Sequence, residues 1–408
     1  MIHSIASLAR AYLDGAESPV DALDCCIDAI ERLDPTLGAW QASYLDEARQ
    51  AAAGAEQVLR SGHRIGPFQG IPFALKDLVD LEGRVTTGGS AAWRDRVSPT
   101  TATIARRMLA AGGVLVGKTK TVEFAFGGWG TNQHMGTPRN PWDAEDHRAP
   151  GGSSSGSAVA VAARMVPIAI GTDTGGSIRL PAAFCGIVGL KVTEGVLPTD
   201  GIIPLAHSLD TPGPLVTTVE DAALCFDVLT GRAQPLVDDD WRRGTGLYDA
   251  LGRGISGLRL GVIDDRERAA CSPDVLAEYD RALDVLAGLG AQLSVYSSPL
   301  PFDEMLRATG VLMSAEAFTH HGHLLTDPEA PLDEDVRARA LAGRDHSAVE
   351  YIRTGLQRTV DQQTFLHSLG HIDALLTPTT TTTAPRVADI DQASAPGHFT
   401  RAVKYLGL

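Results

Sequence analysis

The chain has 408 residues, of which 44% are hydrophobic and 21% are charged, and it contains 43 Gly and 23 Pro. This composition is typical of a globular protein with many tight turns. The formal net charge of −15 argues against direct binding to nucleic acid, because an acidic surface repels phosphate backbones.

The amino-terminal region is predicted to be helical. Apolar side chains recur with helical spacing over 2–14 and 19–33, and a third helix is expected over 43–60. The first residues form an amphipathic pattern and lack the basic stretch and apolar core of a signal peptide. No apolar run approaches the roughly 20 residues that span a bilayer. We therefore expect a cytoplasmic protein with no membrane partner.

From about residue 66 onward, short apolar runs alternate with helical stretches. The predicted strands are 72–75, 114–117, 166–170, 187–190, 258–263, 291–296 and 372–376. The predicted helices are 100–111, 156–164, 218–230, 273–289, 303–325 and 347–368. This alternation predicts an α/β fold with a mixed central β-sheet covered by α-helices. Residues 232–256 are predicted to form a surface loop, and the Thr run 379–383 an ordered loop.

No sequence pattern indicates a metal or another cofactor. The five cysteines contain no C-x-x-C pair and are expected to be reduced and buried. No cluster of histidines and carboxylates has the spacing of metal ligands.

Residues Gly112 to Thr119 match the phosphate-loop pattern G-x-x-x-x-G-K-[ST]. A phosphate loop needs a strand before its first glycine and a flexible turn between the glycines. Here a helix is predicted before Gly112, and the residues between the glycines are typical of a buried strand. We therefore do not expect a nucleotide site.

Residues Gly152 to Gly156 match G-x-S-x-G, the pattern of a nucleophile elbow with Ser154 as nucleophile. That motif needs a strand that runs directly into the turn. The preceding residues, 141–150, are charged and rich in Pro, which argues against an α/β-hydrolase.

A third constellation runs from Gly151 to Lys191, where two Gly/Ser clusters flank an apolar helix and a strand. The second cluster, 171–177, follows a predicted strand and opens a helix. A Gly-rich turn at a helix amino terminus directs several backbone N–H groups at one point, which is the geometry that an oxyanion needs. Ser177, at the end of this cluster, is therefore a candidate nucleophile.

A nucleophilic serine needs a base, and no histidine near this region has the pattern of a catalytic triad. A neutral lysine is the other option, because burial disfavours its charged form. Lys76 ends the apolar run 71–75, and functional groups gather at the carboxyl ends of strands in α/β folds. A structural role for Lys76 is the alternative.

Taken together, these segments resemble the amidase signature family. The resemblance rests on Lys76, the Gly/Ser cluster at 151–158 and the segment GTDTGGSIRLPAAFCGIVGLK at 171–191. The further matching segments are 88–90, 117–143 and 208–214. The resemblance is close over about residues 1–220 and loose afterwards.

The resemblance implies one domain over 1–408 with the mixed sheet of that family. Residues 1–65 would form amino-terminal helices, 66–220 the signature core and 221–408 a variable half. The closing sequence RAVKYLGL resembles the start of a segment that family members continue, so we expect the carboxyl-terminal strands of the family fold to be absent. Ser155 stands where the family has Gly, and we expect the backbone to tolerate it.

The resemblance assigns a Ser–cis-Ser–Lys trio to Ser177, Ser153 and Lys76. Neutral Lys76 would take a proton from Ser153, which takes one from the nucleophile Ser177. The oxyanion hole maps to the backbone N–H groups of Thr174, Gly175, Gly176 and Ser177. The supporting residues, expected to fix the loop geometry or to hydrogen-bond within the site, are Ser154, Asp173 and Arg179. An apolar acyl pocket or core packing are both open for Phe124, Phe126, Trp129 and Leu205.

The function that the resemblance implies is hydrolysis of a C–N bond in a small or medium amide, with carbamates and urea-like compounds included. The partner is then a small-molecule amide, and a homodimer is a family-level expectation. One alternative is the glutaminase component of a tRNA-dependent amidotransferase, its A-type chain, which works with partner subunits. A non-enzymatic alternative is an inactive scaffold with the amidase fold.

Overall fold

The computed structural model describes residues 4–231 and 246–408. The first half contains α1 (Ile5–Leu13), α2 (Pro19–Leu37), β1 (Trp40–Ser43), α3 (Leu45–Arg60), β2 (Pro72–Lys76), α4 (Thr103–Ala110), β3 (Val114–Thr119), α5 (Ser155–Ala162), β4 (Ile168–Asp173), α6 (Arg179–Phe184), β5 (Val188–Gly189), β6 (Thr211–Val216) and α7 (Val219–Thr230). The second half contains α8 (Gly246–Leu251), β7 (Arg259–Ile263), α9 (Asp265–Arg268), α10 (Pro273–Gly288), β8 (Gln292–Tyr296), α11 (Phe302–Leu325), α12 (Glu334–Leu341), α13 (Ala348–Leu369), β9 (Ala374–Leu376) and α14 (His398–Tyr405). Single 3₁₀ turns lie at Ala91–Trp93, Glu123–Ala125, Ala342–Asp345 and Val387–Asp389.

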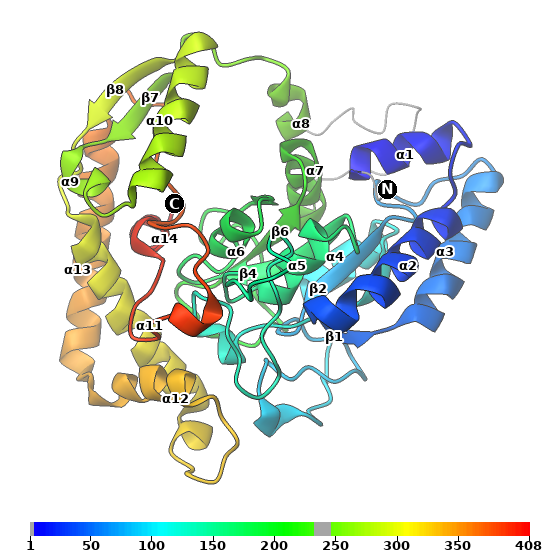
Figure 1. Ribbon diagram of the computed structural model, residues 1–408, viewed down its shortest axis with the longest axis horizontal. Helices are drawn as coiled ribbons and strands as arrows, with labels where there is room; N and C mark the ends of the chain where they lie inside the picture. Colours follow the sequence, from blue (N-terminus) through cyan, green and yellow to red (C-terminus); the bar gives the residue numbers. More distant parts are fainter. Residues whose placement is uncertain (1–3, 232–245) are drawn as a thin grey trace.

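A six-stranded mixed sheet forms the centre of the molecule, in the order β1-β3-β2-β4-β6-β5. β2 is parallel to both β3 and β4, whereas β1, β6 and β5 pair antiparallel with their neighbours. The predicted α/β fold with a mixed central sheet is therefore confirmed. Figure 1 shows α1, α2 and α3 on one side of this sheet and the carboxyl-terminal helices on the other.

Both faces of the central sheet are buried. Successive side chains of a strand point to opposite faces, and helices cover each of them. Phe73 and Leu75 of β2 join one hydrophobic cluster, which α1, α4 and α7 cover. Ala74 joins a second cluster on the opposite face, together with residues of α2, α3 and α5. Lys76 follows Ala74 by two residues in β2, so its side chain points to the same face of the sheet, which α5 covers.

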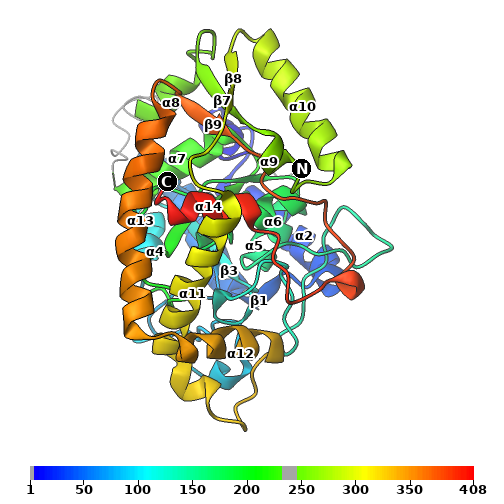
Figure 2. The ribbon, with the colours of Figure 1, turned by 90° about the vertical axis from the view of Figure 1, so that its left-hand side faces the viewer.

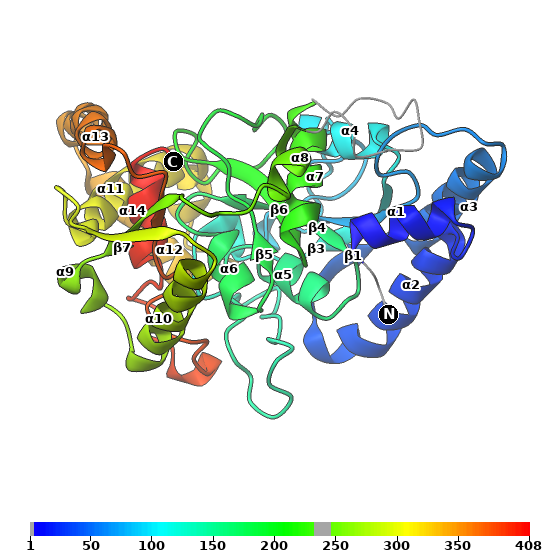
Figure 3. The ribbon, with the colours of Figure 1, turned by 90° about the horizontal axis from the view of Figure 1, so that it is seen from above.

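The strands of the second half pair with one another and not with the central sheet. They form a three-stranded parallel sheet in the order β8-β7-β9. Figure 3 shows this sheet and α10 at one end of the molecule, with α1–α3 at the opposite end and the central sheet between them. The alternation of strands and helices along the chain did not indicate that the strands form two separate sheets.

Several elements differ from the sequence prediction. The pattern missed β1 and β6, because β1 has only four residues and β6 contains Pro212 and Pro214, which sequence rules keep out of central strands. α8 lies inside the predicted loop 232–256, of which 232–245 are outside the described residues. Residues 379–383 form a loop with neither helix nor strand, as predicted.

The structure agrees with the rejection of the phosphate-loop and nucleophile-elbow patterns. Gly117, Lys118 and Thr119 belong to β3 and are buried, and Lys118 Nζ forms a buried ion pair with Asp77 Oδ1 at 3.3 Å. No strand leads directly into the turn before Ser154, because residues 141–150 form turns and loop.

Replacing Lys118 with Met is expected to destabilise the fold strongly, because it leaves the carboxylate of Asp77 buried without its cation. Breaking a buried pair in this way costs about 3–5 kcal/mol. Arg60→Ala is the matched control, since it removes a pair with Glu56 in which the arginine side chain is 75% exposed; it should cost less than about 1 kcal/mol. Urea unfolding followed by circular dichroism measures both changes, and equal costs would contradict the assignment of a structural pair.

Candidate active site

Lys76 lies at the carboxyl end of β2 and is completely buried. Its Nζ atom donates hydrogen bonds to Ser153 Oγ at 2.7 Å and to Thr172 Oγ1 at 2.8 Å. Burial lowers the pKa of Lys76 to about 7, and the negative charges of Asp210 and Asp173 oppose this shift only in part. A substantial fraction of Lys76 is therefore neutral near pH 7 and able to accept a proton.

Ser153 lies two residues before the start of α5, is fully buried, and follows a cis Gly152–Ser153 peptide bond. Its carbonyl oxygen accepts hydrogen bonds from Thr121 Oγ1 at 3.0 Å and from Val122 N at 3.2 Å. Its hydroxyl is thereby held against Lys76. Ser155, the departure from the family pattern, opens α5 without a positive φ, so a side chain at this position causes no backbone strain.

Asp173 ends β4 and organises the turn that follows it. Its carboxylate accepts hydrogen bonds from the backbone N–H groups of Gly176 at 2.7 Å and Ile178 at 3.2 Å. The Arg179 side chain donates to it twice, at 3.0 and 2.9 Å. Burial by itself raises the pKa of Asp173, but the charge and hydrogen bonds of Arg179, together with the charges of Lys191 and Lys404, outweigh burial and lower it. Asp173 is therefore a buried carboxylate that fixes the shape of the turn.

The same hydrogen bonds determine which backbone N–H groups of the turn remain available. The N–H of Gly176 was predicted to belong to the oxyanion hole, but it donates to Asp173 Oδ1 instead. Within 4–231 and 246–408, the N–H groups of Thr174, Gly175 and Ser177 have no hydrogen-bond acceptor. Three of the four predicted donors are thus free to bind an oxyanion.

Ser177 lies at the end of this turn and is 6% exposed. Its carbonyl oxygen accepts a hydrogen bond from Ser154 N at 3.2 Å, which links the turn to the start of α5. The hydroxyl of Ser154 donates to Thr172 O at 3.2 Å. Ser154 is thus engaged in holding β4 and α5 together, which suits a supporting residue.

A narrow pocket opens beside Ser177. Its lining combines residues of the candidate site with the distant Met313 of α11 and Arg401 of α14. The lining consists of Ala125, Phe126, Gly127, Gly128, Gly175, Ser177, Leu180, Met313, Ala395, Pro396, Gly397 and Arg401. Of the four apolar residues considered for an acyl pocket, Phe126 lines it. Phe124 and Leu205 pack in a core cluster with α11 and α12, and Trp129 packs against Phe184. The side chains of Phe124, Leu205 and Trp129 therefore belong to the hydrophobic core.

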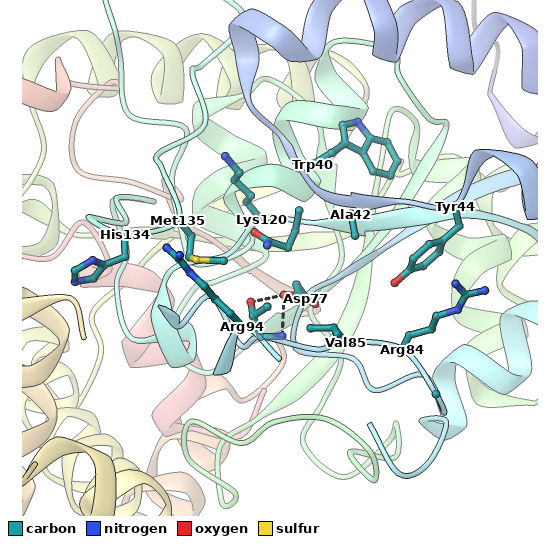
Figure 4. Close-up of a pocket in the computed structure, with 13 residues that line it drawn as sticks. Trp40, Ala42, Tyr44, Asp77, Arg84, Val85, Arg94, Lys120, His134 and Met135 are labelled. Carbon is teal, nitrogen blue, oxygen red and sulfur yellow. Dashed lines mark hydrogen bonds between the residues drawn. The ribbon is translucent and has the colours of Figure 1, made fainter. Parts of the chain in front are cut away.

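A larger pocket of about 750 Å³ lies elsewhere, beside β1 (Figure 4). Trp40, Tyr44, Arg84 and Lys120 are among the residues that line it. None of Lys76, Ser153 and Ser177 does. Ser177 therefore opens onto the narrow pocket and not onto the wide one, and Lys76 and Ser153 line neither of these two pockets.

Three residues near the trio were not singled out from the sequence: Thr172, Asp210 and Arg401. Thr172 contacts Lys76 directly, and Asp210 accepts a hydrogen bond from the Thr174 side chain. Both lie inside segments that carried the family resemblance, so the motif itself contained the signal. Arg401 comes more than two hundred residues after Ser177, and only the folded chain brings the two together.

Within the part of the chain that the structure describes, no group of three or more His, Cys, Asp or Glu residues could hold a metal ion. A membrane-crossing helix, long and apolar enough to span a bilayer, is also absent from these described residues.

Comparison with known proteins places this geometry in a family. The family model described as amidase matches residues 21–406. The chain belongs to the amidase signature family. It is 39% identical over 382 residues to the 2-amino-5-chloromuconic acid deaminase of Comamonas testosteroni, and the match covers 91% of this chain and 78% of that protein.

Two further relatives show the range of this amidase signature family. The chain is 35% identical over 412 residues to the A-type chain of the glutamyl-tRNA(Gln) amidotransferase of Symbiobacterium thermophilum, over 95% of this chain and 84% of that one. The crystal structure of an amidase matches with a TM-score of 0.88 at 29% identity, over 99% of this chain and 90% of the other. The predicted family is confirmed, and so is the enzyme class, a hydrolase of C–N bonds.

Gly152→Ala is expected to damage this amidase site, because an added Cβ would lie 2.6 Å from Gly127 O and 2.7 Å from Gly130 N, which are backbone atoms that cannot move aside. Overpacking of this kind costs about 1–3 kcal/mol or more. The control is Gly54→Ala in α3, where an added Cβ meets nothing within 4 Å; it should stabilise the helix by about 0.5–1 kcal/mol. Thermal unfolding should show a lower melting temperature for Gly152→Ala and a higher one for Gly54→Ala. An unchanged melting temperature for Gly152→Ala would contradict the close approach of the backbone atoms.

Proposed function

We propose that this chain is a serine amidohydrolase in which Ser177 is the nucleophile and Ser153 and Lys76 relay its proton. The observation that carries this proposal is the buried Lys76, hydrogen-bonded to Ser153 and with its pKa lowered to about 7. A lysine in this state is a competent general base near neutral pH, because the ideal catalytic pKa lies close to the working pH.

The proposed reaction proceeds through an acyl-enzyme. Neutral Lys76 Nζ accepts a proton from Ser153 Oγ, which accepts one from Ser177 Oγ as the latter attacks the amide carbonyl carbon. The tetrahedral oxyanion is stabilised by the free N–H groups of the turn. The C–N bond then breaks, and the relay returns the proton to the departing amine. Water attacks the resulting ester by the same relay and releases the carboxylic acid.

The substrate class of this proposal is a small or medium amide, with carbamates and urea-like compounds included. The relative from Comamonas testosteroni supports a small-molecule substrate, since it is named as the deaminase of a small acid, 2-amino-5-chloromuconic acid. A homodimer and a cytoplasmic location stay predictions.

A fluorophosphonate tests the nucleophile. One adduct on Ser177 is expected by intact-mass analysis and peptide mapping, and Ser177→Ala should abolish it. Ser154→Ala is the matched control and should retain labelling, since Ser154 serves a supporting hydrogen bond. An adduct on Ser154, or no adduct on folded protein, would sink the proposal; the second result would favour the inactive scaffold.

The proposed base predicts the pH dependence of activity. Lys76 acts only when neutral, and its neutral fraction grows as the pH rises through the pKa of about 7. The value of kcat/KM should therefore increase up to about pH 7–8 and then level off. Lys76→Met should lower it about 10²–10⁴-fold. A profile that is flat between pH 5.5 and 8.5 would contradict Lys76 as the base.

The glutaminase component of a tRNA-dependent amidotransferase is the second candidate, and the 35% identity to such a protein over 95% of this chain favours it. Under this reading, glutamine hydrolysis to ammonia should rise when partner subunits of a tRNA-dependent amidotransferase are added. Glutamine hydrolysis unaffected by partner subunits, with efficient cleavage of other amides, would rule it out.

A further inference from the structure

Arg401 extends from α14 across the turn that carries the candidate oxyanion hole. A Cβ placed on Gly175 would lie 3.2 Å from Arg401 Cγ and 3.5 Å from its Nε, so the arginine side chain passes directly over Gly175. A Cβ placed on Gly397 would lie 3.3 Å from the same Cγ atom. Arg401 and Ser177 line the same narrow pocket, and Figure 2 shows α14 crossing beside α11.

The segment that carries Arg401 is tied to the turn on both sides. Thr400 Oγ1 donates a hydrogen bond to Gly175 O at 2.8 Å. Arg179 Nη2 donates one to Thr400 O at 3.0 Å. These hydrogen bonds hold the backbone next to Arg401 against the turn that ends at Ser177.

The Arg401 guanidinium has no protein partner in the described parts of the chain, where neither a hydrogen bond nor an ion pair is formed by its side chain. Its neighbours differ in this respect: Arg179 binds Asp173, Arg358 binds Glu194, and Arg339 donates to backbone carbonyls. Burial, followed by the charge of Arg339, lowers the pKa of Arg401 to about 10. Arg401 thus remains a cation at neutral pH, partly buried and uncompensated.

The surroundings of Arg401 favour an anion. It is the only charged residue among those that line the pocket, and Phe126, Leu180 and Met313 make the lining largely apolar. A charge pair formed in apolar surroundings is screened less than one in water. A guanidinium binds a carboxylate through two parallel hydrogen bonds in one plane, which suits a narrow pocket.

We propose that Arg401 binds a carboxylate of the substrate, so that the enzyme acts on amides that also carry a carboxylate close to the scissile bond. Monoamides of short dicarboxylic acids are the simplest members of this class. This inference rests on the proposed amidohydrolase function and adds to it the charge of the substrate.

The test compares monoamides of three-, four- and five-carbon dicarboxylic acids with neutral isosteres in which an isopropyl group replaces the carboxylate. The wild-type enzyme should prefer at least one anionic amide over its isostere. Arg401→Gln should lower kcat/KM for that amide about 10- to 100-fold, mainly through KM, because a hydrogen-bonded charge contact is lost. Activity on the isostere should change less than about threefold, and Arg401→Lys should restore part of the preference.

Arg94→Gln is the matched control, since Arg94 lines the separate pocket beside β1, and it should leave both activities unchanged. Fluorophosphonate labelling of Ser177 in Arg401→Gln checks that the variant is folded. If that variant does not fold, the carboxylate site is tested in the wild-type enzyme by protection of Ser177 against labelling. Succinate should slow the labelling, and butane-1,4-diol at the same concentration should not.

Different failures have different meanings. If Ser177 is labelled and amides are cleaved without regard to charge, the carboxylate site is wrong and the amidohydrolase proposal stands. Equal losses on anionic and neutral amides in Arg401→Gln, or equal effects of succinate and the diol, also overturn the carboxylate site. If Ser177 is never labelled and no amide is cleaved, the proposed function fails and the carboxylate site fails with it.

Discussion

Burial of Lys76 inside the central sheet is the constraint on which the site depends. β2 lies between two parallel neighbours, and both faces of the sheet are covered, so the ammonium group has no access to water. An unpaired buried charge is costly, and the group responds by a lowered pKa. Its contacts are two hydroxyl groups, from Ser153 and Thr172.

The neighbouring β3 shows what a different partner does to a buried lysine. Lys118 is also buried, but its Nζ atom lies 3.3 Å from a carboxylate oxygen of Asp77. A paired ammonium group serves the fold, because it compensates the charge of its partner. Lys118 also donates to the hydroxyl of Thr86, and burial lowers its pKa as well. The difference is the carboxylate beside Lys118, whereas Lys76 donates to the hydroxyl of a serine with which it can exchange its proton.

The turn after β4 depends on one carboxylate in a similar way. Asp173 binds the N–H groups of Gly176 and Ile178 together with the Arg179 side chain, and thereby leaves other N–H groups of the turn unbonded. The carboxyl-terminal segment completes this arrangement, because Thr400 binds both the turn and Arg179. Segments far apart in the sequence thus determine together which polar groups remain free for a ligand.

The amino-acid sequence by itself determined the local parts of this protein. Apolar periodicity located most helices and strands. The Gly/Ser clusters, together with Lys76, indicated the family. Both kinds of pattern are made by residues close together in the chain. The sequence did not reveal β6, whose prolines contradict strand rules, or the use of the Gly176 N–H by Asp173. Only the tertiary structure decided that α14 places Arg401 beside Ser177 and that Phe124, Trp129 and Leu205 pack in the core. The physical reason is that burial, pKa and free hydrogen-bonding capacity arise from contacts between distant segments, which no local pattern records.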